Sequence, residues 1–202
     1  VVPLPEGASD EIGLADAIIK GVRECSTLLL DWSEPAAKLV GATCKVFWDG
    51  ENEWFYARIL NYDKGHNRHY VYYLADSTAE WISISDEYVF VAEAMVMVRM
   101  RGTWPALRYW ASPKAVEISK TLPGYHKQCE YIEFFPAETE KNVSREYAFL
   151  PSTQFDPIKE EFMPTRPLKR LVSCMDSVKK EKADMKSVVD LVLESIHQTI
   201  FE

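Results

Sequence analysis

Two stretches of the chain alternate short runs of β-forming residues with turn residues, and both stretches are rich in aromatic side chains. In the first, runs at 44–48, 54–60 and 68–74 are separated by the turn sequences DGEN and DKGHN. Short strands at this spacing are typical of a small barrel or sandwich. The interior of a small barrel holds few large rings, so we expect several of them to line a surface or a cleft.

The second stretch follows the first without a linker, because residues 91–94 pass directly into an expected strand at 95–100. Further strands are expected at 127–135 and 146–150, with a short helix at 113–120. The absence of a Gly/Ser-rich or Pro-rich spacer predicts two barrels that pack as a rigid pair.

Helices are expected at both ends of the chain. Residues 9–25 carry apolar residues at helical spacing, and Ser33 followed by Pro35 marks a second helix start. Near the C-terminus, Thr165 is a capping residue with Pro167 in the first turn. Two apolar stripes follow, which we interpret as packing faces. They consist of Leu168, Leu171, Val172 and Met175, and of Met185, Val188, Val189, Val192 and Ile196.

The predicted fold is therefore α+β, with two small antiparallel β-barrels between helical segments. Residues 1–40 are expected to form an N-terminal helical brace, and residues 41–93 the first barrel. Residues 94–202 are expected to form the second barrel and a C-terminal helical bundle.

Charge is distributed unevenly along the chain. Residues 1–93 hold sixteen acidic and seven basic residues, a balance of −9, whereas residues 94–202 have a balance of +1. The first part is therefore expected to favour a basic partner over phosphate groups.

The longest apolar runs, such as 89–97, are too short to span a bilayer, so no membrane partner is expected. The four scattered cysteines favour free thiols over a zinc site.

The residues of the first stretch resemble those of a Tudor domain. The resemblance rests on GATCKVFW at 41–48, WFYARI at 54–59, HYVYY at 69–73 and EW at 80–81. Tudor domains bind methylated lysine or arginine in an aromatic cage. By position, the resemblance implies a cage of Trp48, Phe55 and Tyr73, completed by the carboxylate of Asp76. The alternative is that these rings are core residues of the barrel.

The second stretch resembles a PWWP domain, on the basis of VMVRMRG at 96–102, WPAL at 104–107, YIEFF at 131–135 and YAFL at 147–150. The usual Tyr-Pro pair of this family is missing between Gly102 and Trp104, so the motif is degenerate. The resemblance implies a second cage formed by Met100, Trp104 and Phe134.

PWWP domains commonly add a basic face for DNA beside the methyl-lysine pocket. The residues that could supply one here are Arg99, Arg101, Arg108 and Lys114. Because residues 94–162 hold nine acidic and nine basic residues, these charges are equally well read as an ordinary solvated surface.

No motif for catalysis is present in the sequence. A phosphate-binding glycine loop, a Gly-x-Ser-x-Gly elbow and a His-Glu-x-x-His helix are all missing. Because these motifs are missing, we expect no cofactor and no catalytic residue. His66 and His69 have no third ligand nearby, so we expect no metal site.

The function that these features favour is recognition of a methylated histone tail by a nuclear chromatin protein. Nucleosomal DNA and other subunits of a chromatin complex are the further expected partners. Two alternatives remain open at this point: a structural scaffold within a nuclear complex, and a nucleic-acid adaptor that acts through residues 94–202.

Overall fold

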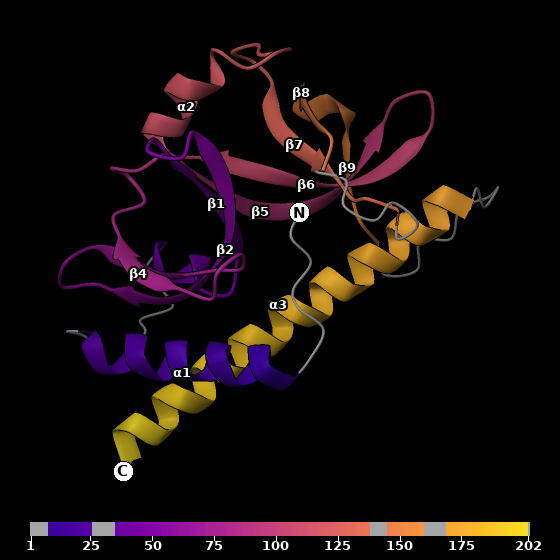
Figure 1. Cartoon of the computed structure of the whole chain (residues 1–202). Coiled ribbons are helices and arrows are strands. Elements are labelled where there is room, and N and C mark those ends of the chain that lie inside the picture. Colours follow the sequence, from indigo (N-terminus) through magenta and orange to yellow (C-terminus); the bar gives the residue numbers. More distant parts are fainter. Residues whose placement is uncertain (1–7, 26–34, 138–144, 160–168, 202) are drawn as a thin grey trace.

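A computed structural model describes residues 8–25, 35–137, 145–159 and 169–201. Its strands form one antiparallel sheet in the order β4-β3-β2-β1-β5-β6-β7-β8, with β9 paired to β5 (Figure 1). The strands are β1 Thr43–Trp48, β2 Glu53–Asp63, β3 Arg68–Tyr73, β4 Ala79–Ile82, β5 Val89–Arg99, β6 Thr103–Ala111, β7 Glu130–Phe134, β8 Tyr147–Leu150 and β9 Phe155–Pro157. The α+β class expected from the sequence is confirmed.

The expectation of two closed barrels is wrong, because the sheet is continuous and does not close. Strand β5 joins its two halves. Near its start Val91 pairs with Cys44 of β1, and near its end Val98 pairs with Phe155 of β9. The expected boundary between residues 93 and 94 falls inside this strand, at a register shift between Ala92 and Ala94. Since residues 89–99 contain no turn residue, the strand runs on through both halves.

The helices are α1 Ala8–Glu24, α2 Pro113–Ser119 and α3 Lys169–Phe201, with short 3-10 helices at Ala37–Leu39 and Ser152–Gln154. The helices at 8–24 and 113–119 match the expected ones. Ser33, Thr165 and Pro167, which were expected to start helices, lie outside the described residues. In place of a C-terminal bundle, the described residues after 168 form the single helix α3.

Helix α3 passes beneath both halves of the sheet and crosses α1 under the first half (Figure 1). Its C-terminal part contributes Val188 and Val192 to the core that contains β1, β2 and β3. Its N-terminal part contributes Cys174 and Val178 to the core under β6 and β7. One continuous helix therefore supports the two halves of the sheet.

Helix α1 lies unusually close to the sheet at Gly21. A Cβ atom at this position would lie 2.3 Å from a ring carbon of Tyr70 on β3. The glycine is therefore required by the close approach of helix and strand.

Among the described residues, no helix is long and apolar enough to cross a membrane.

Candidate functional site

The pairing of β1 with β2 distributes the aromatic residues over the two faces of the sheet. Val46 pairs with Phe55, and Lys45 pairs with Tyr56. Because successive side chains of a strand point to opposite faces, Trp48 shares its face with Phe55. Lys45 shares the other face with Tyr56. Side chains on the first face form a cluster of rings in the first half of the molecule. Side chains on the second face point toward the second half.

The structure brings Trp48, Phe55 and Tyr73 together, as the Tudor resemblance implies. The centroid of the Trp48 ring lies 4.9 Å from that of Phe55 and 5.1 Å from that of Tyr73. Tyr73 is only 2% exposed, whereas Trp48 and Phe55 are half-buried at the edge of the core. We call these three residues the ring cluster.

A carboxylate does approach the ring cluster, but it belongs to Glu80. The hydroxyl of Tyr73 donates to Glu80 Oε1 at 2.7 Å and accepts from the indole Nε1 of Trp48 at 3.2 Å. The carboxylate of Asp76 accepts instead from Thr78, at 3.1 Å from its backbone nitrogen and 2.8 Å from its hydroxyl. Burial, followed by the hydrogen bond to Glu80, raises the pKa of Tyr73, so the phenol stays neutral.

The three residues of the second expected cage, Met100, Trp104 and Phe134, also come together. They come from the β5–β6 turn, from β6 and from β7, and they line a hollow of about 180 Å³. We call this hollow the edge pocket; its walls are Met100, Trp104, Pro105, Phe134, Phe135, Glu146, Arg170 and Cys174. Glu146 and Arg170 are charged wall residues that the sequence did not point to.

The four basic residues proposed for DNA contacts are mostly engaged within the chain. Arg99 contacts Asp156 at 3.0 Å, and Arg108 contacts Glu93 at 2.9 Å. Lys114 lies 4.0 Å from Glu87. Each of these cations thus has a carboxylate partner, which weakens its attraction for phosphate.

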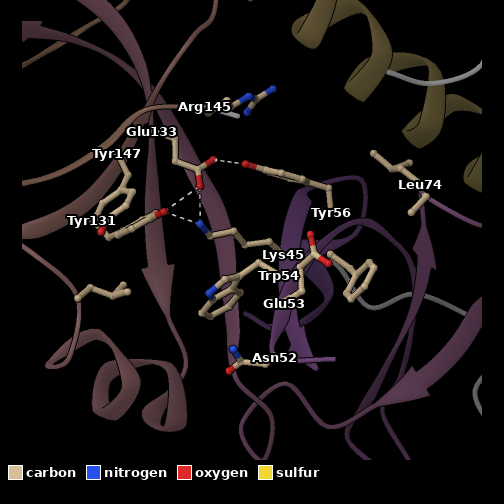
Figure 2. A pocket seen from close by; sticks show the side chains of 13 residues that line it. Lys45, Asn52, Glu53, Trp54, Tyr56, Leu74, Tyr131, Glu133, Arg145 and Tyr147 are labelled. Atoms are coloured by element: carbon tan, nitrogen blue, oxygen red, sulfur yellow. Dashed lines mark hydrogen bonds and ion pairs between the residues drawn. The ribbon is translucent and has the colours of Figure 1, made fainter. Parts of the chain in front are cut away.

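A hollow of about 430 Å³ lies between the β1–β2 hairpin and strands β7 and β8, and we call it the junction pocket. It is lined by Lys45, Asn52, Glu53, Trp54, Phe55, Tyr56, Leu74, Ala75, Leu122, Tyr131, Glu133, Arg145 and Tyr147. Figure 2 shows that the Lys45 ammonium group reaches across from β1 toward Tyr131 and Glu133 of β7.

The ammonium group of Lys45 is itself enclosed by aromatic rings. It lies 4.3 Å from the centroid of Tyr131, 5.1 Å from Trp54 and 5.3 Å from Phe90. These distances are within the range of cation–π attraction. Lys45 donates hydrogen bonds to Tyr131 and to Glu133. One of the chain's own cations is therefore held in a box of rings at the centre of the molecule.

The carboxylate of Glu133 is fully engaged and only 2% exposed. Oε1 accepts from Lys45 and from Tyr131, and Oε2 accepts from Tyr56 and Tyr109, both at 2.9 Å. Burial raises the pKa of Glu133, but the charge and hydrogen bond of Lys45, the charge of Arg145 and the hydrogen bond of Tyr131 outweigh it, so the pKa lies below its usual value. The network joins the two halves of the sheet through ionised groups.

A second buried charge cluster links the sheet to α3. Glu181 of α3 contacts Arg58 of β2 at 3.2 Å and Arg145 at 3.2 Å, and it accepts from Thr43 at 2.6 Å. The guanidinium of Arg145 also lies over the rings of Tyr56 and Phe135. Its Nε and Nη1 are buried and meet no acceptor among the described residues. Sequence reasoning missed both clusters, because the partners of each lie far apart along the chain.

Comparisons with family models, curated proteins and solved structures found no match for this chain. Within the described ranges, no group of three or more His, Cys, Asp or Glu residues is arranged to hold a metal ion.

Proposed function

We propose that the protein binds a methylated lysine or arginine side chain on a basic, histone-type tail, as part of a nuclear chromatin complex. The observation that carries the proposal is the edge pocket. In it Met100, Trp104 and Phe134 surround a hollow of about 180 Å³ at the molecular surface. Met100 is 56% exposed, so this wall of the pocket is open to an incoming side chain.

The composition of the edge pocket suits a methylated cation. The faces of Trp104 and Phe134 carry negative quadrupole potential, and the thioether of Met100 adapts its shape to a guest. Methyl groups make an ammonium or guanidinium easier to remove from water, so it gains more from such walls. The carboxylate of Glu146 adds a negative charge at the pocket wall.

The charge of the first half supports a basic partner. Residues 1–93 have a balance of −9, which attracts a tail rich in lysine and arginine. The ring cluster is a weaker candidate for the cage than the edge pocket. Tyr73 is covered on all sides, and the Trp48 indole hydrogen of this cluster is already bonded to the Tyr73 hydroxyl.

A peptide array of modified and unmodified histone tails tests the proposal. We expect the 202-residue chain to retain methylated peptides above their unmodified counterparts, and Trp104→Ala to lose this preference. Trp110→Ala is the control, because Trp110 is a second tryptophan of β6, exposed at the surface, that does not line the edge pocket. A methyl preference that remains in Trp104→Ala is assigned to the ring cluster if the double Trp48→Ala/Phe55→Ala variant removes it.

Equal retention of methylated and unmodified tails would contradict the proposal. So would a methyl preference that survives both the Trp104→Ala and the Trp48→Ala/Phe55→Ala substitutions. Folding of each variant is checked by the dispersion of its amide NMR spectrum, so that a lost signal reports on the site.

A further inference from the structure

The edge pocket already has a cation of the chain's own on one side. Arg170 lies in the first turn of α3, and the carbon at the centre of its guanidinium group is 5.9 Å from the centroid of the Trp104 ring. The same side chain lines the pocket together with Met100 and Phe134. The contact therefore lies on the ring that the proposed guest would use.

A guanidinium over an indole and a methylammonium over an indole are held by the same force. Both are attracted by the ring quadrupole within about 6 Å of the centroid. A hollow of about 180 Å³ leaves little room for a second cation near the first, and two like charges in one pocket repel each other. Arg170 and a cationic guest are therefore expected to compete at the Trp104 ring.

We infer that Arg170 is a built-in competitor, which partly occupies the edge pocket and is displaced when a cationic side chain binds. This inference rests on the proposed function, since it concerns the same pocket. Arg170 is exposed, and its long side chain has several rotatable bonds through which the guanidinium group can move off the Trp104 ring. Arg170, at the start of α3, therefore lowers the affinity of the edge pocket for a cationic side chain. The other end of the same helix supports the first half of the sheet.

An NMR titration measures the competition directly. Tetramethylammonium chloride and free Nε-trimethyllysine are the probes, and the indole N–H signal of Trp104 is the readout at constant ionic strength. Arg170→Gln removes the cation, and we expect it to tighten binding of both probes by roughly 2- to 5-fold, the size of an exposed cation–π contact. Arg170→Lys keeps a cation and should stay closer to the unaltered chain.

The matched control is Lys169→Gln, which removes one positive charge at the adjacent exposed position, from a residue that does not line the edge pocket. If Lys169→Gln tightens binding as much as Arg170→Gln, the effect is general charge and the inference fails. It also fails if Arg170→Gln leaves affinity unchanged or weakens it, because Arg170 would then be a wall of the pocket.

Binding of a cation in the edge pocket and competition by Arg170 are distinguished by different results. If neither the unaltered chain nor Arg170→Gln shifts the Trp104 signal with either probe, the proposed function is contradicted at its own pocket, and the inference falls with it. If both bind with equal affinity and Trp104→Ala abolishes binding, the proposed function stands and only the competition is refuted.

Discussion

Lys45 of β1 and Glu133 of β7 lie 88 residues apart in the sequence and form a buried ion pair between the two halves of the sheet. Their side chains are 7% and 2% exposed. Tyr131, Tyr56 and Tyr109 complete the shell of the carboxylate. The pair is therefore a structural link between the halves, and its removal is expected to destabilise both.

Lys45→Met is expected to lower the free energy of unfolding by about 3–5 kcal/mol, because it leaves the Glu133 carboxylate buried without its cation. Urea unfolding followed by fluorescence measures this change. The double variant Lys45→Met/Glu133→Gln should cost clearly less than the sum of the two single variants. Additive single effects would show that the two groups do not depend on each other.

Stability should fall in acid because of Glu133. Its pKa in the folded protein is lower than the usual value, so the ionised form stabilises the fold above the ordinary carboxyl pKa. That contribution is lost as the pH falls from about 5 through the lowered pKa of the folded state. Unfolding free energies measured from pH 7 to pH 3 should show the decline.

Glu133→Gln is the control for this pH dependence. It should flatten the decline but not abolish it, because the pKa of Glu181 is lowered as well: attraction to Arg58 and Arg145 outweighs the effect of burial. An unchanged slope in Glu133→Gln would show that other carboxyl groups cause the acid sensitivity.

Gly21→Ala is expected to destabilise the protein by about 1–3 kcal/mol, because its methyl group would collide with the ring of Tyr70 at 2.3 Å. Gly13→Ala in the same helix is the matched control. There the nearest atom is the Tyr72 hydroxyl oxygen at 3.5 Å, an ordinary contact. Alanine is also the better helix former, so thermal unfolding of Gly13→Ala should show no loss of stability.

Trp48→Ala should lower the free energy of unfolding by about 2 kcal/mol, because the indole packs on Phe55 and Tyr73 at the edge of the first core. Trp110→Ala, which removes a 44% exposed indole from β6, should change it far less. Equal stabilities of the two variants would show that the ring cluster contributes little to the fold.

The local features of the fold could be predicted from the sequence. Alternation of apolar residues and turn sequences located the strands from β1 to β3, and helix α2 begins at Pro113 behind the capping Ser112, close to the expected span. Met100, Trp104 and Phe134, which were expected to lie together, line one pocket.

The links between distant parts of the chain could not be predicted. Lys45 alternates with buried residues, a pattern typical of a strand with one solvated face, yet both faces of β1 are covered. The second face is covered by residues that follow more than eighty positions later. Glu181 and Arg170 are ordinary polar helix residues in the sequence, and only the course of α3 under the sheet gives them partners.

The most direct test of the account compares a charged guest with a neutral one of the same shape. A trimethyllysine tail peptide, chosen as the strongest signal on the array, and its isostere with carbon in place of the quaternary nitrogen are titrated into the chain by calorimetry. We expect the trimethyllysine peptide to bind about tenfold more tightly, and Trp104→Ala to abolish the difference. Equal affinities of the two peptides, or a difference that survives Trp104→Ala, would contradict recognition of a cation in the edge pocket.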